Sequence, residues 1–553
     1  MALCLACGLS AMAGNGIGFR WGSTDVRYQM DEEPVELAKS AFAFPAWRGE
    51  RVNAQAVLWT DKDLSGVRLT VGDLRRGTSV IPAASVRANF LSYVIADNVD
   101  LTKPGQCGHR LDKAEWDSLM VADVISDAEM VDVKAGNVQP VWLSIRVPSD
   151  AKPGRYVGEL GVKADGMETM ALKVELEVLD RTLPEPGDWK FHLDLWQNPY
   201  SVARYYKVPL WSEEHFEAMR PIMRRLADAG QKVITATLLD RPWNGQTEDA
   251  FGPMVTKIKR ADGTWLYDYT VFDKWVEFML GLGIDKQINC YSMIPWSLEF
   301  DYYDQAANSL TFVKAGTDSK EYKSYWTSFV KDFARHLREK GWFDKTMIAM
   351  DERPLDAMIE ALDIIKGVEP GFKVSLAGNY HPEIEEDLDD LCLAFGHEFP
   401  ADVKAARERS GKVSTVYTCC AETRPNTFLD SPLPEATWIG WHAFAKNYDG
   451  YLRWAFNSWT EDPLRDTRFR TWPAGDCFLV YPGNQSSPRF ERLIEGVQDY
   501  EKARIMREEW QVKGDKKSLA RLDAALARFN PEALSAEGAS LAVSEARKVV
   551  NHR

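Results

Sequence analysis

The chain has 553 residues and a formal net charge of −15. Its length exceeds that of one ordinary domain, which predicts two or three domains. The acidic excess argues against nucleic acid or an anionic membrane as a partner, because both need a basic surface. The 20 Trp residues indicate either stacking surfaces for a ligand or a large aromatic core.

The first residues, MALCLACGLSAMAG, are apolar and small, and A-M-A-G resembles a signal-peptidase site. We expect residues 1–16 to be the remnant of a signal peptide. The protein would then be exported, to the periplasm, the cell surface or the medium. Cys7 follows Leu-Ala, which hints at a lipoprotein signal. No later stretch reaches the roughly 18 apolar residues that a membrane span needs.

The eight Cys residues form no metal-binding pattern, since neither a pair of C-x-x-C motifs nor H-E-x-x-H is present. Cys290, Cys392 and Cys419 lie in apolar, strand-like runs. A thiol in such a run is most often a small buried hydrophobe. The sequence therefore predicts no metal site and assigns no disulfide.

Residues 17–185 have an all-β pattern. Short alternating runs, among them RVNAQAVLWT and MALKVELEVLD, are separated by clusters of turn residues. The segment SIRVPSDAKPGRYVGELGVKADG predicts a strand, a Pro-Gly turn and two more strands, as in an immunoglobulin-like sandwich. The proline-rich RTLPEPGDW then predicts a linker.

Over residues 186–486, strands alternate with longer helical patterns, clearest at 212–230, 272–283, 320–341 and 355–367. The helix after the fifth strand is weak, so one unit is expected to be irregular. Eight strands alternating with helices over about 270 residues match a (β/α)8 barrel of the TIM type. The predicted strands lie at 190–199, 232–240, 287–296, 346–354, 373–382, 391–400, 413–422 and 451–460.

Residues 487–553 are predicted to form a C-terminal helical region. A first amphipathic stretch covers 487–510, a second begins near Lys516 and a third near Leu534. The expected order is therefore a sandwich, a barrel and a helical appendage.

The stretch TMIAMDERP at 346–354 places Asp351 and Glu352 at the end of the fourth barrel strand. Active sites of such barrels lie at the carboxyl ends of the strands. Pro354 fits a chain that leaves the sheet there, because proline cannot donate to the ladder. A structural role is the alternative, with the Glu paired to an Arg and the Asp capping the next helix.

Adjacent carboxylates suit one kind of glycoside hydrolysis. Two carboxyls that flank a glycosidic bond are about 5–9.5 Å apart, whereas neighbouring Cα atoms are only about 3.8 Å apart. In substrate-assisted hydrolysis the 2-acetamido oxygen of the sugar is the nucleophile. The enzyme then needs one acid for the leaving oxygen and one carboxylate beside it for the acetamido N–H.

The runs MIAMDERP, LEVLDRTLPEP, NTFLDSP and GYLRWAFNSWTEDPLRDTR with AGDCFLVYPG resemble glycoside hydrolase family 123. The likeness covers most of residues 40–500. It implies a retaining β-N-acetylgalactosaminidase that acts on glycan ends, with an N-terminal sandwich and a catalytic barrel. It also implies no metal and no organic cofactor. By this resemblance Asp351 polarises the acetamido group, and Glu352 is the general acid/base.

Other polar and aromatic residues near the predicted strand ends are candidates for binding the substrate. Tyr417 could bond the acetamido carbonyl, Trp459 could stack on the sugar, and Asp476 could bind a hydroxyl. Each has a structural alternative in packing or ion pairing. Burial among aromatic rings is expected to raise the pKa of Glu352. The full candidate set is Trp196, Trp296, Asn379, Tyr417, Asn457, Trp459 and Asp476.

Two other functions stay open on the sequence. The first is a β-N-acetylhexosaminidase with a different sugar specificity. The second is a non-catalytic glycan-binding surface protein that uses the sandwich and the barrel for recognition. The natural glycan and the oligomeric state do not follow from the residues.

Overall fold

The computed structural model describes residues 16–37, 42–97 and 116–551. Within it the chain divides into two compact units. One comprises Met1–Tyr93 and Met120–Thr182, and the other Val94–Leu119 and Leu183–Arg553. The predicted signal-peptide remnant, apart from Gly16, lies outside the described residues.

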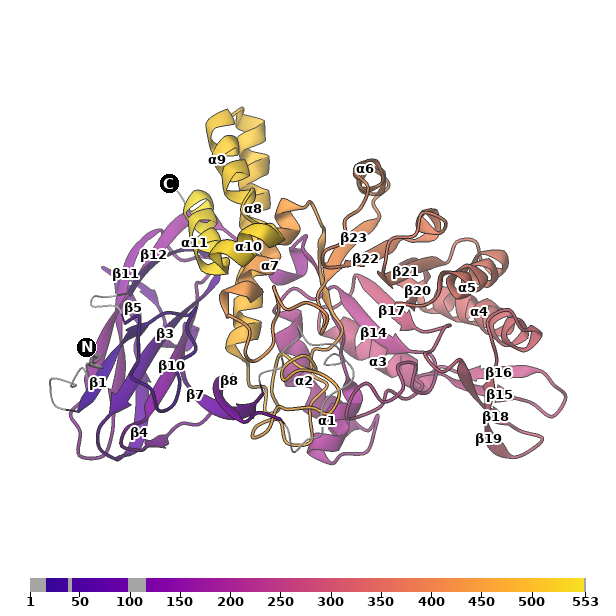
Figure 1. Cartoon of the computed structure of the whole chain (residues 1–553), viewed down its shortest axis with the longest axis horizontal. Helices are drawn as coiled ribbons and strands as arrows, with labels where there is room; N and C mark the ends of the chain where they lie inside the picture. The colour runs from indigo at the N-terminus through magenta and orange to yellow at the C-terminus, as the bar shows by residue number, and fades with distance from the viewer. Residues whose placement is uncertain (1–15, 38–41, 98–115, 552–553) are drawn as a thin grey trace, which may run out of the picture. The chain divides into compact units, whose positions relative to one another are not determined.

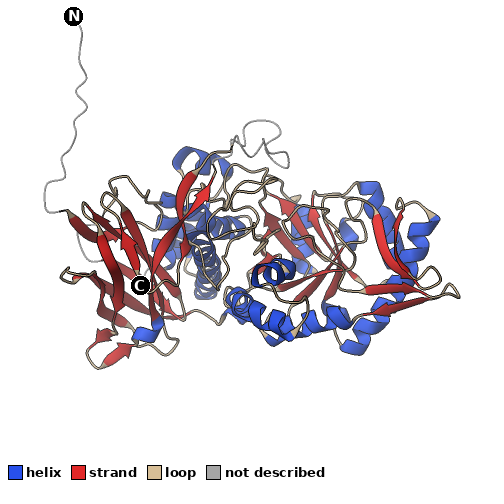
Figure 2. Cartoon of the chain, turned by 90° about the horizontal axis from the view of Figure 1, so that it is seen from below, coloured by secondary structure: helices blue, strands red, loops and turns tan. Residues whose placement is uncertain are grey.

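The first unit is a sandwich of two sheets with a shared apolar core (Figures 1 and 2). The core forms because apolar and polar side chains alternate along the strands. In the third strand of the larger sheet, Tyr156 and Leu160 are buried, while Arg155 and Glu159 are exposed. One sheet has the order β1 (Ile17–Gly22), β3 (Arg51–Thr60), β10 (Val138–Arg146), β7 (Val86–Ala96) and β8 (Leu119–Ile125). The other has the order β2 (Phe42–Arg48), β12 (Met170–Thr182), β11 (Gly154–Lys163), β4 (Leu64–Val71) and β9 (Val131–Val133), with β5 (Leu74–Arg76) and β6 (Ser79–Ile81) beside β11.

The second unit contains an eight-stranded parallel sheet that curls into a nearly closed barrel. Its first and second strands meet through a bridge between Leu193 and Gln231. All eight strands fall within predicted stretches, give or take one residue, but each ends earlier. They are β13 (His192–Leu195), β14 (Val233–Thr237), β17 (Gln287–Tyr291), β20 (Thr346–Met350), β21 (Lys373–Gly378), β22 (Asp390–Ala394), β23 (Val413–Tyr417) and β24 (Gly450–Arg453).

Helices cover the outside of this barrel, as Figure 2 shows in blue around the red strands. The predicted irregular unit is confirmed: only a short 3-10 turn, Glu385–Asp387, separates β21 from β22. The acidic run EIEEDLDD there has no apolar face with helical spacing. The helices are α1 (Pro199–Tyr206), α2 (Glu213–Ala227), α3 (Thr270–Gly281), α4 (Lys320–Lys340), α5 (Leu355–Val368), α6 (Ala401–Arg409) and α7 (Pro434–Ala445).

A small mixed sheet, which no sequence pattern predicted, is inserted after β14 and β17; it consists of two antiparallel hairpins whose inner strands pair in parallel. It packs on α4 through ring contacts such as Trp265 on Tyr325 and Tyr267 on Phe329. An Asp-Gly dipeptide at 262–263, typical of hairpin turns, could have indicated it. Its order is β16 (Trp265–Asp268), β15 (Thr256–Lys259), β18 (Glu299–Asp304) and β19 (Ser309–Lys314).

The C-terminal helices belong to the same compact unit as the barrel. The first packs on α7, where Gly440 and Gly496 let the two backbones approach closely. These helices are α8 (Pro488–Lys513), α9 (Lys516–Leu526), α10 (Pro531–Glu537) and α11 (Ala539–Val550). The sandwich, the barrel and the C-terminal helices confirm the predicted fold class.

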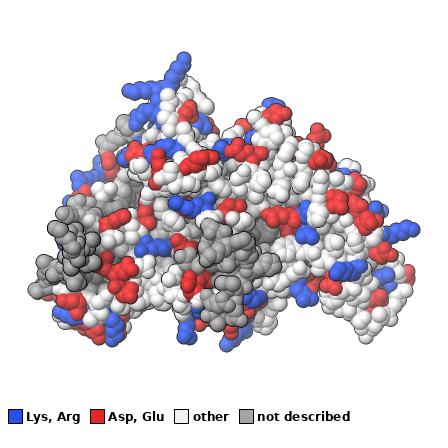
Figure 3. Space-filling model, viewed as in Figure 1, with Lys and Arg blue, Asp and Glu red and all other residues white. Residues whose placement is uncertain are grey.

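The surface carries both signs of charge. Figure 3, in the orientation of Figure 1, shows acidic and basic side chains interspersed over the face that it views. A cluster of basic side chains lies at the top, over α9. Among the helices of the described residues, none combines the length and the apolar character that crossing a membrane requires.

Candidate active site

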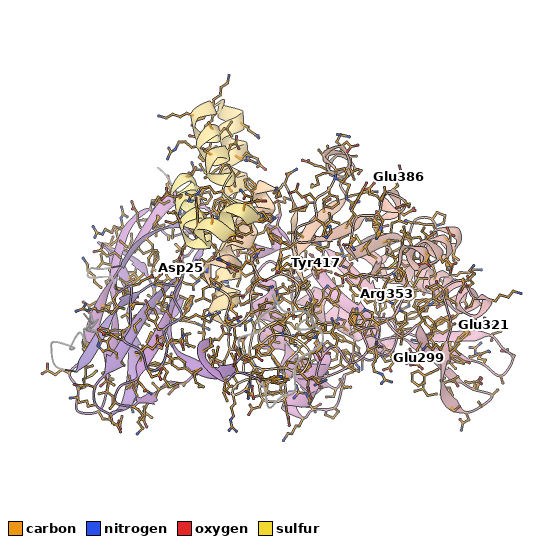
Figure 4. The ribbon with its side chains drawn as sticks, in the orientation of Figure 1. Asp25, Glu299, Glu321, Arg353, Glu386 and Tyr417 are labelled. Atoms are coloured by element: carbon orange, nitrogen blue, oxygen red, sulfur yellow. The ribbon has the colours of Figure 1, made fainter. Side chains whose placement is uncertain are left out.

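A pocket opens at the carboxyl ends of the barrel strands, where the βα loops begin. Its walls come from the ends of β13, β20, β21, β23 and β24 and from the loops after β14, β17 and β24. Figure 4 marks Tyr417 and Arg353 in this part of the unit. The lining residues are Trp196, Trp243, Gln246, Trp296, Asp351, Glu352, Ala377, Tyr417, Cys419, Cys420, Leu452, Trp454, Trp472 and Asp476.

The acid pair lies where the chain leaves the sheet. All five residues of β20 are buried, and α5 begins four residues after Asp351, at Leu355. Asp351 is buried and Glu352 is exposed. The two neighbouring carboxyls therefore reach the same pocket from different depths.

Asp351 has one carboxylate oxygen fixed and one without a partner. Its Oδ2 accepts a hydrogen bond of 2.6 Å from the indole Nε1 of Trp296. Its Oδ1 is buried and has no hydrogen-bond partner in the described protein. Burial raises the pKa of Asp351 to about 6, and the Trp296 bond and the charge of Arg353 partly offset this rise.

Glu352 accepts a hydrogen bond from the hydroxyl of Tyr417, the last residue of β23. Burial raises the pKa of Tyr417 well above its usual value, and the nearby Glu352 charge adds to this. Tyr417 is therefore a neutral donor at physiological pH. The burial that was expected for Glu352 falls on Asp351 instead, because the chain turns outward after β20.

The base of the pocket is a compact aromatic cluster. Trp196, from the end of β13, stacks on Trp243 with ring centres 5.0 Å apart. Both rings contact Tyr291 at the end of β17, at 4.5 Å and 5.1 Å. These rings give the pocket a rigid apolar base.

Three of the predicted binding residues do not line this pocket. Asn457 is buried and exchanges hydrogen bonds with the backbone of Asn198 at the start of α1. Trp459 is also buried, and its indole donates to the carbonyl of Val480 at 2.8 Å. Asn379 is exposed beyond the end of β21. Asn457 and Trp459 thus support the loops around the barrel end.

Asp476 borders the pocket but has no exposed surface. Its Oδ1 accepts from the guanidinium of Arg453 at 2.7 Å and from the indole of Trp454 at 3.2 Å. Burial raises the pKa of Asp476, and the charge of Arg453 opposes this rise. Its Oδ2 is buried and has no hydrogen-bond partner among the described residues, so the hydroxyl binding that the sequence suggested stays a prediction.

Several lining residues could not be predicted from the sequence, and for the most important one the reason is strand length. The last strand was predicted to continue to 460, which would place Trp454 inside it; the strand ends at Arg453. Trp243, Gln246 and Trp472 lie in irregular loops, and no periodic pattern marks them.

The cysteines agree with the predicted buried thiols in two of three cases. Cys290 and Cys392 are free and buried, whereas Cys419 is free and half-buried at the pocket. Within residues 16–37, 42–97 and 116–551, no group of three or more His, Cys, Asp or Glu side chains could hold a metal ion.

A (β/α)8 barrel with a carboxyl pair and aromatic walls at its strand ends is typical of glycoside hydrolases. The family model for the glycoside hydrolase 123 catalytic domain matches residues 196–506. The model for the glycoside hydrolase 123 N-terminal domain matches residues 21–164. The chain belongs to glycoside hydrolase family 123.

Among solved structures, one is similar over nearly its whole length. It is a family 123 glycoside hydrolase from Clostridium perfringens, described in a study of glycolipid glycan hydrolysis. It shares 28% identity with this chain, covers 97% of both chains and superposes with a TM-score of 0.87. A family 39 glycoside hydrolase from Bacteroides cellulosilyticus WH2 matches over 68% of this chain and 76% of that chain, at 10% identity. Its TM-score of 0.34 is too low to support a structural comparison. No curated protein sequence matches the chain.

Proposed function

We propose that this protein is a retaining exo-glycoside hydrolase that removes terminal β-linked N-acetylgalactosamine from glycans by substrate-assisted catalysis. The observation that carries the proposal is the state of Asp351: Trp296 holds one oxygen and the other has no partner. A buried acceptor of this kind calls for a donor from the substrate. An acetamido N–H is such a donor. The C. perfringens relative, described with glycolipid glycan hydrolysis, supports a glycan substrate.

The environment of the pair favours the substrate-assisted mechanism over two opposed carboxyls. Asp351 and Glu352 follow each other in the chain and line one pocket. Two such groups are poorly placed to approach a sugar carbon from opposite faces. They can instead act on adjacent parts of one sugar, Asp351 on the 2-acetamido group and Glu352 on the glycosidic oxygen.

In the first step the acetamido carbonyl oxygen attacks the anomeric carbon, and the bond to the glycosidic oxygen breaks. The leaving oxygen takes the proton of Glu352. The acetamido N–H donates to Asp351, whose negative charge stabilises the oxazolinium ion that forms. This charge acts in a buried site, where electrostatic stabilisation is stronger than in water.

In the second step Glu352 removes a proton from water, and the water oxygen attacks the anomeric carbon. The bond between this carbon and the acetamido oxygen breaks, which restores the acetamido group and regenerates the protonated Glu352. Two inversions give net retention. Exposure of Glu352 toward the pocket opening suits a group that meets the aglycone first and water afterwards.

Tyr417 holds Glu352 before substrate binds. Its neutral hydroxyl can then donate a hydrogen bond to the acetamido carbonyl oxygen. This bond would orient that oxygen for attack on the anomeric carbon. Trp296 positions Asp351 and is itself 38% exposed, so it also reaches the pocket rim.

The test is hydrolysis of 4-nitrophenyl N-acetyl-β-D-galactosaminide by wild type, Asp351→Asn and Glu352→Gln. We expect wild-type turnover and losses on the order of 10²–10⁴-fold in kcat for each variant. The Glu352→Gln loss should be smaller on this activated leaving group than on a natural glycan. Folded wild type without turnover, or variants with wild-type rates, would refute the proposal.

We further propose that the protein is exported. Cys420, at the pocket, is disulfide-bonded. Disulfides persist in oxidising compartments and are rare in the cytosol. Peptide mapping under non-reducing conditions should show Cys420 in a disulfide in protein from its native compartment; a free Cys420 thiol there would contradict export.

A further inference from the structure

The tryptophans of the pocket differ in how far their rings are open. Trp196 and Trp243 are 5% and 3% exposed, so protein covers their faces. Trp296 is exposed, but its indole N–H is committed to Asp351. Trp454 lines the pocket, is half-buried and directly follows β24. Its ring can be covered by a ligand without disturbing the bonds of the acid pair.

A buried ion pair fixes the edge of the Trp454 ring. Its indole Nε1 donates to Oδ1 of Asp476 at 3.2 Å, and the same oxygen accepts from Arg453 at 2.7 Å. The side chains of Arg453 and Asp476 have no exposed surface. Arg453 in turn donates to Asn426 at 2.9 Å. Asp476 therefore fixes the indole edge through Oδ1, while its buried Oδ2 has no partner among the described residues.

The neighbouring wall keeps the ring from turning. Trp472 packs edge-on against Trp454, with centres 5.9 Å apart and planes at 68°. Its own indole donates to the carbonyl of Gln246 at 2.8 Å. The loop that carries Trp472 is tied down by Asp97, which accepts from the Ala474 N–H at 3.2 Å. This wall is therefore formed before a ligand arrives.

We propose that Trp454 is the surface on which the terminal sugar ring stacks, and that Asp476 is a positioning residue that acts through it. This assignment rests on the function proposed above and deepens it. A ring that is already held loses little conformational freedom when a ligand binds. Indole also offers a large apolar face with a polar edge, and here that edge is occupied by Asp476.

Stacking of the sugar ring on Trp454 has a consequence for sugar specificity. In N-acetylgalactosamine the axial 4-hydroxyl points to one face of the ring, so the C–H groups at C3, C4 and C5 share the other. In the gluco epimer the C4 hydrogen lies on the opposite face and the patch is broken. Stacking on Trp454 therefore favours the galacto sugar.

The first experiment is calorimetric binding of free N-acetylgalactosamine to wild type, Trp454→Phe and Trp454→Ala. We expect Trp454→Phe to weaken binding severalfold and Trp454→Ala by at least about tenfold, equal to about 1.4 kcal/mol. Trp459→Phe, outside the pocket, should bind as wild type does. Thermal midpoints confirm that each variant is folded. Wild-type affinity in Trp454→Ala, or no binding by wild type, would overturn the proposal.

The second experiment separates positioning by Asp476 from direct contact. Asp476→Asn should raise KM with little change in kcat, because a stacking surface contributes equally to ground and transition states. Added to Trp454→Ala, it should cause no further loss of sugar affinity. Additive losses would show that Asp476 binds the sugar itself. Trp454→Phe leaves the ion pair intact, so the proposal stays testable if Asp476→Asn does not fold.

The two proposals fail in different ways. Turnover by wild type tests whether the protein is a hydrolase. The affinity of the Trp454 variants for the sugar, relative to that of wild type, tests stacking on Trp454 and needs no turnover. The affinity for N-acetylgalactosamine relative to that for N-acetylglucosamine is a third readout. Trp454→Ala should reduce this preference for N-acetylgalactosamine. An unchanged preference would contradict the role of Trp454 in specificity.

Discussion

Asp351 and Glu352 are neighbours in sequence but have different environments. Asp351 is 8% exposed and bonded to an indole, while Glu352 is exposed and bonded to a phenol. A buried carboxylate without full hydrogen bonding is costly to the folded state. Such a cost is common at active sites, where function requires a group that stability disfavours.

The first prediction concerns the stability cost of Asp351. Its pKa rises from 3.8 to about 6 on folding, so the folded state binds this proton more tightly than the unfolded chain does. The free energy of unfolding therefore falls as pH rises through this range, by about 3 kcal/mol. Asp351→Asn should match wild type near pH 4 and have the higher thermal midpoint at pH 8.

Glu352→Gln is the matched control for this prediction, since Glu352 is exposed. It should show a much smaller gain at pH 8. If Asp351→Asn were no more stable than wild type at pH 8, the carboxyl would not carry a stability cost in the folded protein.

The second prediction concerns Trp296 and the pH profile. The Trp296 bond favours the ionised form of Asp351, which the mechanism requires. In wild type kcat/KM should fall as pH drops below about 6, because Asp351 then takes up a proton and loses the negative charge that the mechanism requires. Trp296→Phe removes the bond and should move the acid limb upward by about one pH unit.

Trp459→Phe serves as the control, because this buried tryptophan bonds to a backbone carbonyl away from the pocket. Its acid limb should stay where wild type has it. An unmoved acid limb in Trp296→Phe would mean that ionisation of Asp351 does not control the rate.

At the scale of elements, strand ends decided which site residues could be predicted. The pattern of short apolar runs indicated all eight barrel strands, and the acid pair was found because Pro354 marks the exit from β20. The exit from β24 carries no such mark. The apolar run YLRWAFNSW continues past Arg453 into a loop, so Trp459 at its far end was named as a candidate and Trp454 was not.

Burial also limits what a sequence reveals about a carboxyl. Asp476 was singled out because an Asp before an apolar run needs partners, and its Oδ1 has them in Arg453 and Trp454, whereas its Oδ2 has none among the described residues. Both partners lie more than twenty residues earlier in the chain. The sequence therefore predicts that the carboxyl is paired but not that it lies behind an indole.

The third prediction concerns the packing of α7 on α8. A Cβ added to Gly440 would lie 2.2 Å from the carbonyl oxygen of Gly496, and backbone atoms cannot yield cheaply. Gly440→Ala should cost about 1–3 kcal/mol or more and lower the thermal midpoint by several degrees. Gly367→Ala in α5 has open space around its Cβ and should be neutral or stabilising. Equal midpoints for the two variants would contradict this packing.

At the scale of the whole molecule, the C-terminal helices are part of the catalytic unit. Glu501 of α8 accepts from the backbone N–H groups of Lys190 and Phe191, just before the first barrel strand. Arg547 of α11 bonds to Glu495 and Asp499 of α8. The sequence indicated these helices as an appendage, because hydrophobic periodicity does not reveal which surface a helix covers.

The central claim is that the 2-acetamido group of the substrate takes part in the chemistry. The most direct measurement compares kcat/KM for 4-nitrophenyl N-acetyl-β-D-galactosaminide and for 4-nitrophenyl β-D-galactoside, which differ at this group. We expect the first to be cleaved and the second to be slower by at least about 10³-fold, because it lacks the nucleophile. Equal rates on the two substrates would contradict substrate-assisted catalysis and the role of Asp351 in it.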